Sequence, residues 1–401
     1  MPPLTRSSVS RRGRVSVARS LLTCFLLFTL LSAEACKRAP KHPSRRSAET
    51  ERREAVEARD QQTIALRLKS AVERAGGSEV WVKRAALASF APQRADTPIE
   101  VLAIPSTFDP VLAALQAEGA NQALDVRVEW KNSSDGRRLA EVRLSRRRQP
   151  IGRWQVREVG RLLRAAIVID DLGQNFGVAE QLLALPYPLT FSVLPRLPHS
   201  VETADAAHRA GRAVMLHLPM EPDPGSHVTA GDGAIKVGMA PDAVVEAVKS
   251  DLAAVPYARG VNNHMGSRAT ADAPLMKVVM QVLAEEHVYF VDSRTTVSTS
   301  ALDVAREAGV PAFYRSVFLD DTETKDYTLG QLREFRRVVR QQGAALAIGH
   351  PHPTTVAALQ EFLPELERDD IQLVPASELV RLPEAAKLSP PHPAGIARHG
   401  K

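Results

Sequence analysis

Cysteine is nearly absent from this 401-residue chain, whose two cysteines, Cys24 and Cys36, both lie close to the N-terminus. Because the remaining residues cannot form an internal disulfide, the fold must rest on a hydrophobic core. A cysteine nucleophile is excluded for the same reason. The chain also lacks the G-x-S-x-G, G-x-x-x-x-G-K-[ST] and H-E-x-x-H patterns, which argues against α/β-hydrolase, P-loop and zincin chemistry.

The apolar run over residues 21–31 is too short to span a bilayer comfortably. It follows five arginines and precedes Ala33-Glu34-Ala35, which resembles a signal-peptidase site. We therefore expect residues 1–35 to be a signal peptide, with an uncleaved anchor as the alternative. Acylation of Cys36 would make a lipoprotein, although Leu would be expected where Ala33 stands. The predicted location is periplasmic or membrane-anchored in a bacterial envelope.

A strong excess of one charge is also missing. The chain has a formal net charge of +6, but residues 1–35 hold five arginines and one glutamate, which leaves only +2 for the rest. This small excess gives little reason to expect a nucleic-acid partner. Residues 36–60 are densely charged but contain no aromatic residue, so they predict a solvated linker, with a merger into the first helix as the alternative, rather than a nucleic-acid-binding arm.

Length and pattern divide the remaining chain into two folded parts and a tail. Over residues 61–160, helix-like stretches mix with strands in which apolar and polar residues alternate. This pattern predicts a small α+β domain without a catalytic constellation, suited to binding or spacing. Residues 383–401 are rich in Pro, His and Lys and predict a disordered tail.

From about residue 164 to 382, short apolar runs alternate with helical stretches. Such an alternation predicts a parallel sheet, either open or closed into a barrel. The runs that predict strands cover residues 165–169, 189–194, 213–218, 260–261, 288–291, 312–313, 344–348 and 371–374. The sequence therefore predicts an α/β fold for this part of the chain.

Two adjacent carboxylates, Asp170 and Asp171, follow the first of these runs. The mouth of a parallel α/β fold is where active sites usually lie. A helix N-cap beside a solvated acid is the structural alternative. In the functional interpretation, one carboxylate binds a metal ion and the other acts as a base or orients one.

Histidines stand at similar strand ends further along the chain. His217 precedes the strand-ending Pro219, and His264 lies in a segment dense in polar groups, so both are candidate metal ligands. Imidazole ligands favour zinc over magnesium. His350 and His352 are flanked by prolines, and one of them would act as general acid. Acids and histidines gathered at one rim predict a divalent-metal hydrolase.

Further polar residues flank these candidates. Asn262 and Asn263 would orient His264 or contact a substrate, since buried amides need partners. Asp292 also follows an apolar strand and would support a histidine or contact the substrate. Arg315 would neutralise a carboxylate or bind substrate, with a surface ion pair as the alternative.

Together these residues resemble the divergent polysaccharide deacetylase family, whose relatives are carbohydrate esterases built on a distorted (β/α) barrel. The resemblance covers about residues 164–382 and not the N-terminal part. The motifs that carry it are Ile169-Asp170-Asp171-Leu172-Gly173, Phe191-Ser192-Val193-Leu194-Pro195, His217-Leu218-Pro219-Met220-Glu221-Pro222, Asn262-Asn263-His264-Met265-Gly266-Ser267, Asp292-Ser293 and Gly349-His350-Pro351.

This resemblance implies a distorted (β/α) barrel of the polysaccharide deacetylase type, preceded by the small α+β domain. It also implies metal-dependent deacetylation of an N-acetylated envelope polysaccharide or peptidoglycan. By the same resemblance, Asp170 corresponds to the catalytic base, Asp171 and His217 to metal ligands, and His350 to the late acid.

One position departs from the pattern of the family's main branch. Glu221 stands where the second metal-binding histidine of an H-x-x-x-H motif would fall. Either Glu221 or His264 must complete the site. We expect His264 to do so, because Pro219 and Pro222 disrupt the helical spacing that would align residues 217 and 221.

The resulting hypothesis places Asp171, His217 and His264 around Zn²⁺ or a similar divalent ion, with an open position for water. Asp170 then takes the proton of the attacking water, and one of the two late histidines protonates the departing amine. The oligomeric state stays open.

Two rival functions remain at this point. The first is a non-catalytic envelope protein that binds glycan or a cell-wall enzyme through a degenerate site, which the replaced histidine favours. The second is another metal hydrolase such as a phosphodiesterase. It requires basic groups near the site, for which the candidates are Arg268, Arg294 and Arg315.

Overall fold

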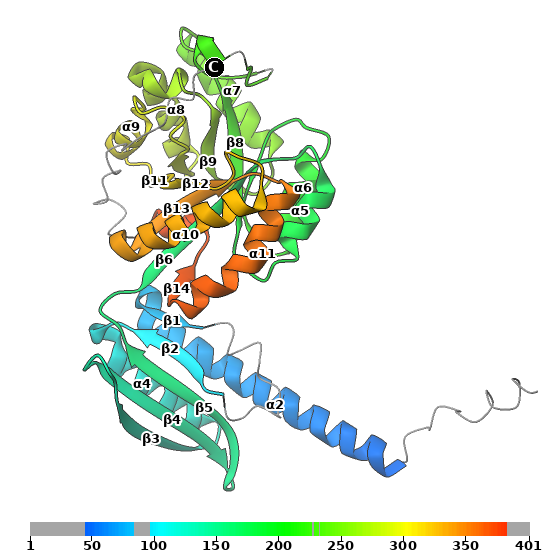
Figure 1. Ribbon diagram of the computed structural model, residues 1–401, viewed down its shortest axis with the longest axis vertical. Coiled ribbons are helices and arrows are strands. Elements are labelled where there is room, and N and C mark those ends of the chain that lie inside the picture. The colour runs from blue at the N-terminus through cyan, green and yellow to red at the C-terminus, as the bar shows by residue number, and fades with distance from the viewer. Residues whose placement is uncertain (1–44, 84–96, 227, 232, 383–401) are drawn as a thin grey trace, which may run out of the picture. The chain divides into compact units, whose positions relative to one another are not determined.

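The structure is a computed structural model that describes residues 45–83, 97–226, 228–231 and 233–382 (Figure 1). The predicted signal peptide, Cys36 and the predicted tail lie outside the described residues. The chain divides into two units, residues 1–60 and 61–401. No helix in the described ranges has the length and apolar character needed to cross a membrane.

Helix α2 (Arg45–Gly76) changes the interpretation of the charged stretch before residue 61. That stretch was expected to be a solvated linker, with a merger into the first helix as the alternative, and it is helical from Arg45 onward. Its charged residues occur at helical spacing, and Arg53 pairs with Glu57 one turn further along. From residue 64 the same helix carries apolar residues into a core.

A five-stranded sheet follows, with strand order β1-β2-β5-β4-β3. Its elements are η1 (Gly77–Glu79), β1 (Val80–Val82), β2 (Ile99–Ala103), α4 (Pro105–Asn121), β3 (Asp125–Asn132), β4 (Arg138–Arg146) and β5 (Gln149–Glu158). Alternation along the strands directs one side of the sheet into a core. Leu68 of α2, Phe108 of α4 and Trp154 of β5 are buried there together. The expected small α+β arrangement is present.

The second sheet is parallel throughout, in the order β11-β10-β9-β8-β7-β6-β13-β12, with β14 beside β6. Its strands are β6 (Leu163–Leu172), β7 (Thr190–Val193), β8 (Ala213–Met220), β9 (Ala258–Met265), β10 (Tyr289–Asp292), β11 (Ala312–Tyr314), β12 (Val317–Phe318), β13 (Ala344–Gly349) and β14 (Ile371–Leu373). The predicted parallel sheet is therefore confirmed.

Helices follow most of these strands, as the predicted alternation requires (Figure 1). They are α5 (Phe176–Leu183), α6 (Ser200–Arg209), α7 (Pro241–Ala254), α8 (Ala273–Glu285), α9 (Ala301–Glu307), α10 (Lys325–Gln342), α11 (Pro353–Arg368) and α12 (Ala376–Leu379). The short helices η3 (Pro224–Ser226) and η4 (Ala269–Ala271) lie in the loops that follow β8 and β9.

The edge strands β11 and β12 are joined by only two residues, Arg315 and Ser316. A flat sheet of these strands would hold its two edges about 34 Å apart. The connection from Tyr314 to Val317 spans at most about 11 Å. The sheet must therefore curl until its edges meet, which produces the distorted barrel.

Alternation along the strands fills the inside and outside of this curled sheet differently. Outward residues such as Ile167 and Leu216 pack with the surrounding helices. Inward residues such as Val168 and Leu346 form a second cluster with Leu379 of α12. Toward the carboxyl ends of the strands the inward residues become polar. The inside of the barrel is therefore apolar near the amino ends of the strands and polar near their carboxyl ends.

Candidate metal centre

A β-bulge brings both carboxylates of the Asp170-Asp171 pair to the same region. Strand β6 pairs with β7 through Ile169↔Phe191 and Leu172↔Val193, so two residues of β6 face one of β7. Consecutive side chains of a regular strand point to opposite faces, and a bulge re-aims them. Asp171 has the left-handed φ of 54° that Asp tolerates better than most residues.

Parallel pairing of β8 with β9 places the next polar residues. His217 is in register with Asn262, and Pro219 with His264. Asn262 and His264 are two residues apart, so they share the inward face of β9. The imidazole rings of His217 and His264 consequently meet edge to face, with ring centroids 4.8 Å apart.

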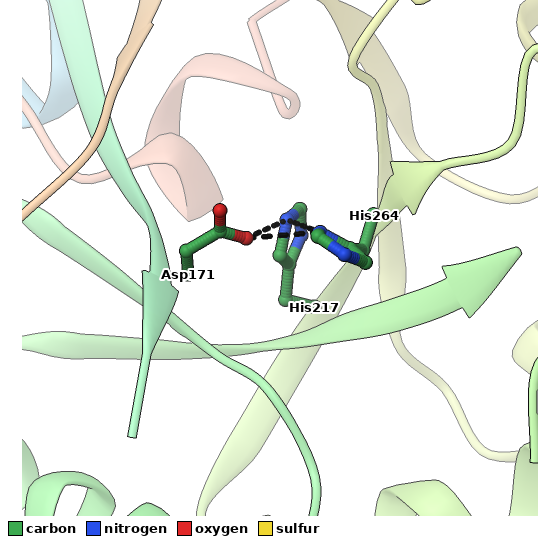
Figure 2. Close-up of side chains that lie close together, drawn as sticks. All are labelled: Asp171, His217 and His264. Atoms are coloured by element: carbon green, nitrogen blue, oxygen red, sulfur yellow. Dashed lines mark hydrogen bonds and ion pairs between the residues drawn. The ribbon is translucent and has the colours of Figure 1, made fainter. Parts of the chain in front are cut away.

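Three atoms from three strands converge at this point (Figure 2). Asp171 Oδ1 lies 3.1 Å from His217 Nε2 and 2.9 Å from His264 Nδ1. The two histidine nitrogens are 3.1 Å apart. The structure therefore brings together the three residues predicted as metal ligands, Asp171, His217 and His264.

The donor set and its spacing fit a divalent ion. Around tetrahedral zinc with bonds of about 2.0–2.1 Å, neighbouring ligand atoms are about 3.3–3.4 Å apart. Asp171 Oδ1 is buried and has no hydrogen bond of regular geometry among the described residues. Its side chain is nevertheless 37% exposed, against 3% for His217. The site is thus open to solvent on one side, as catalytic metal sites are.

Charges in the centre are strongly coupled. Burial alone would lower the pKa of His217, but the carboxylates of Asp170 and Asp171 outweigh burial and raise the pKa above its ordinary value. Burial would raise the pKa of Asp171, but the nearby imidazoles of His217 and His264 lower it. A metal ion at this site would compete with protons for the imidazole nitrogens.

Asn262 and Asn263 both differ from the expectation that they contact substrate. Asn262 is fully buried and contacts His217 and Asp170, not the predicted His264. Asn263 is 1% exposed, and its amide accepts from Ser293 N and donates to Met265 O. Because neither side chain reaches solvent, both act as supports within the barrel wall.

His350 stands level with the carboxylate pair because β13 ends at Gly349, beside Ile169 of β6. Its Nε2 lies 3.9 Å from Asp171 Oδ2, and its Nδ1 lies 2.9 Å from Asp320 Oδ1. Burial would lower the pKa of this imidazole, but Asp320, with Asp170 and Asp171, raises it to about 9. His350 is therefore a strong candidate for holding a proton at the site.

Sequence reasoning missed Asp320. Its carboxylate also accepts hydrogen bonds from the backbone N–H of His350 and from Thr355 Oγ1. A signal was present, since Phe318-Leu319-Asp320-Asp321 repeats the pattern of apolar residues followed by two acids. Strand β12 has only two residues, which made that pattern hard to see.

Other predicted site residues lie in supporting positions. His352 Nδ1 is 3.2 Å from Glu323 Oε1, and the His352 ring centroid lies 6.1 Å from that of His350. Ligand atoms of Asp320, His350 and His352 lie within 4.8 Å of one another, as a group separate from Asp171, His217 and His264. Asp292 accepts hydrogen bonds from Arg294 N and Thr299 Oγ1, so its carboxylate holds the loop after β10 rather than a histidine.

Arg315 also has a supporting position. Its guanidinium donates to the carbonyls of Ser293 and Arg294 and lies over the ring of Phe318. It therefore ties the loop after β10 to strand β12. This contact differs from the predicted alternatives of a surface ion pair or a substrate ligand.

The carboxylate of Glu221 is hydrogen-bonded to residues outside the candidate metal centre. Its carboxylate accepts from Arg268 at 2.8 Å and from the backbone N–H of Val237 at 2.8 Å. Residue 221 follows strand β8, and four residues along a strand span about 13 Å. Glu221 is thus too far along the chain direction to share an ion with His217, and the reason is strand geometry rather than a disrupted helix.

Comparisons with known proteins agree with this architecture. The chain is 39% identical over 228 residues to the uncharacterized protein YibQ of Escherichia coli K12, covering 57% of this chain and 70% of that protein. It is 38% identical over 230 residues to an uncharacterized protein of Haemophilus influenzae, covering 57% and 80%.

A solved structure, the uncharacterized protein ATU2773 of Agrobacterium tumefaciens C58, shares the fold. Its TM-score is 0.53 at 22% identity, covering 55% of this chain and 89% of that one. The model of the divergent polysaccharide deacetylases matches residues 167–380. Since this match spans more than half of the chain and contains Asp171, His217 and His264, the protein is a member of the divergent polysaccharide deacetylase family.

Proposed function

We propose that this protein is a metal-dependent hydrolase that removes acetyl groups from an N-acetylated envelope polysaccharide or peptidoglycan. The observation that carries the proposal is the convergence of Asp171, His217 and His264, with Asp170 and His350 beside them. Asp171 Oδ1 is buried, and two imidazole nitrogens from other strands lie 3.1 and 2.9 Å from it, which is a donor set that a divalent ion takes.

Asp171, His217 and His264 would hold the divalent ion, for which zinc is the best match to two imidazoles and one carboxylate. When bound, such an ion lowers the pKa of a water molecule and polarises an acyl carbonyl. The residues around it then have to move protons and position the substrate.

Asp170 is placed to take the proton of the attacking water. Its Oδ2 lies 3.7 Å from His217 Nε2, on the ligand side of the imidazole. The side chain is 3% exposed, so bulk water does not compete for its oxygens. A carboxylate held this rigidly beside the nucleophile fits a general base.

His350 is placed to supply a proton to the departing amine. Asp320 accepts from Nδ1, which leaves Nε2 directed toward Asp171 and the site. The same carboxylate favours the protonated imidazole. The acid therefore follows β13, and the base lies on the neighbouring strand β6.

The substrate and location belong to the same proposal. Family membership and the leader-like residues 1–35 support an exported protein that acts on envelope glycan. Attachment through an acylated Cys36 and free secretion are both consistent with the sequence.

The two rival functions lose their main support. The degenerate-site interpretation rested on Glu221, whereas His264 supplies a nitrogen at the ligand position. A phosphodiesterase needs free cations, but Arg268 is paired with Glu221, and Arg315 donates to backbone carbonyls. The guanidinium of Arg294 lies over the ring of Tyr314.

The test combines metal content with acetate release. Purified protein is loaded with zinc and incubated with N-acetylated glycan oligomers, and released acetate is measured. We expect activity in the wild type and a loss of about 10²–10⁴-fold in Asp170→Asn with zinc content unchanged. Zinc binding without acetate release from any acetylated envelope glycan would favour the glycan-binding rival instead.

A further inference from the structure

The side chain of Asn262 contacts both the metal ligand His217 and the proposed base Asp170. Its Oδ1 lies 3.0 Å from His217 Nδ1, and its Nδ2 lies 2.9 Å from both carboxylate oxygens of Asp170. The residue is completely buried, on the inward face of β9.

Every hydrogen-bonding position of this amide is used. Oδ1 also accepts from Ser192 Oγ at 2.5 Å, and Nδ2 also donates to Ser293 Oγ at 3.1 Å. An amide offers two acceptor and two donor positions. Asn262 therefore has no capacity left for a substrate, and its orientation is held by four partners.

The orientation of the amide follows from chemistry. A carboxylate only accepts hydrogen bonds, so the atom facing Asp170 must be the NH₂ group. The oxygen then faces His217 Nδ1, which must carry a proton to donate. Nε2 is left with its lone pair directed at Asp171 Oδ1 and His264 Nδ1.

The geometry points to Asn262 as a positioning residue that fixes His217 in the Nδ1–H form needed to bind the metal ion through Nε2 and, with the same amide group, aims the carboxylate of Asp170. This inference rests on the proposed function for the role of Asp170. The effect on His217 concerns metal binding alone and does not depend on any substrate.

Two substitutions of Asn262 distinguish its effect on the tautomer of His217 from its effect on the orientation of Asp170. Asn262→Asp keeps an acceptor for His217 Nδ1 but replaces the donor to Asp170 with a second carboxylate. Asn262→Ala removes both contacts. Asn263→Asp is the matched control, because Asn263 is equally buried on the same strand and contacts neither His217 nor Asp170.

The primary readout is zinc affinity of the full chain, measured by chelator competition. We expect Asn262→Ala to weaken zinc binding about 10–100-fold. Asn262→Asp should bind zinc as tightly as the wild type or more tightly, while its acetate release falls to the level of Asn262→Ala. The Asn263→Asp variant should keep the wild-type zinc affinity.

The second readout is the tautomer of His217 in zinc-loaded, ¹⁵N-histidine-labelled protein, assigned with a His217→Gln sample. We expect an Nδ1–H signal in the wild type and in Asn262→Asp, and its loss in Asn262→Ala. Unchanged zinc affinity and an unchanged tautomer in Asn262→Ala would overturn the inference, as would an Asn262→Asp protein that binds zinc as weakly as Asn262→Ala. Failure of the wild type to bind zinc would instead overturn the proposed metal centre, and the inference with it.

Discussion

Glu221 and His264 are the two side chains that compete for the third ligand position of the metal centre. His264 Nδ1 lies 2.9 Å from Asp171 Oδ1, whereas the Glu221 carboxylate is bonded to Arg268 and Val237. The distinction matters because one of these two residues must supply the ligand that the second histidine provides in the family's main branch.

We predict that His264→Ala will lose bound zinc and that Glu221→Gln will retain it. Removing a nitrogen ligand leaves two protein ligands, fewer than catalytic zinc sites use. Metal content after gel filtration, measured by mass spectrometry, checks this. Equal zinc content in wild type and His264→Ala would exclude His264 from the centre, and zinc loss in Glu221→Gln would reassign the ligand.

Asp320 provides a second prediction at the residue scale. In the metal-free protein, Asp320→Asn should bring the pKa of His350 down from about 9, because the carboxylate that favours the charged imidazole is gone. The imidazole would then lose its proton at a lower pH than in the wild type. An NMR titration of the His350 ring proton checks this, and an identical titration curve in Asp320→Asn would contradict it.

At the scale of elements, strand β6 shows which features the sequence reveals. Its apolar residues predicted a buried strand over 165–169, and the strand is present as Leu163–Leu172. The bulge at Asp170 and Asp171 was invisible, because it is defined by the register with β7 rather than by residue type. The sequence did predict that two neighbouring acids reach one rim, and carboxylate oxygens of Asp170 and Asp171 lie 3.7 and 3.1 Å from His217 Nε2.

Strand β9 shows the opposite limit. Only residues 260–261 were predicted as strand, although β9 extends from Ala258 to Met265. The next three residues are polar and look like a loop, but they belong to the strand: Asn262, Asn263 and His264. Asn262 and Asn263 are buried, and both form hydrogen bonds with Ser293 after the neighbouring strand β10. Polar residues inside a barrel break the hydrophobic pattern on which strand prediction depends.

The bulge itself leads to a prediction. Asp171→Asn should fold like the wild type, since Asn also tolerates a left-handed φ, but it should bind zinc more weakly. Asp171→Val should in addition lower the free energy of unfolding by about 1–3 kcal/mol relative to Asp171→Asn, because a β-branched residue is strained there. Urea denaturation of the metal-free proteins measures the difference, and equal stabilities would argue against the bulge geometry.

At the scale of the whole described molecule, Asp370 joins the two sheets. It lies between α11 and β14, and its carboxylate oxygens are 2.6 Å from Lys83 Nζ and 2.6 Å from an Arg157 nitrogen. Burial would raise the pKa of Asp370, but these two cations lower it. The contact between the five-stranded sheet and the barrel therefore includes the ionised carboxylate of Asp370.

We predict that Asp370→Asn will destabilise the protein by about 1–3 kcal/mol at pH 7, because two hydrogen bonds to a charged group are lost. The φ of 60° at residue 370 is tolerated by Asn, so the change tests charge alone. Asp303→Asn, which removes a 79% exposed carboxylate paired with Arg306, is the control and should change stability by less than about 0.5 kcal/mol.

The pH dependence of this contribution has a definite sign. Because the folded pKa of Asp370 is lowered, its stabilisation is fully present above the ordinary value of 3.8 and is lost as the pH falls through the folded pKa. The difference between wild type and Asp370→Asn should therefore be constant from pH 7 to about pH 5 and shrink in more acidic buffers. Thermal unfolding across this range checks the trend, and a difference that grows on acidification would contradict it.

The two-residue connection between β11 and β12 also limits how this barrel can vary. In the loop that follows β8, residues 223–225 are exposed, and added length at such a place costs little. Lengthening the chain at Arg315 or Ser316 would instead allow the edge strands β11 and β12 to move away from each other. Asp320, which contacts His350, follows β12, and Arg315 ties the loop after β10 to this same strand, so the two edge strands hold supporting groups of the site in place. Insertions should therefore be tolerated in the surface loops of the barrel but not in this two-residue connection.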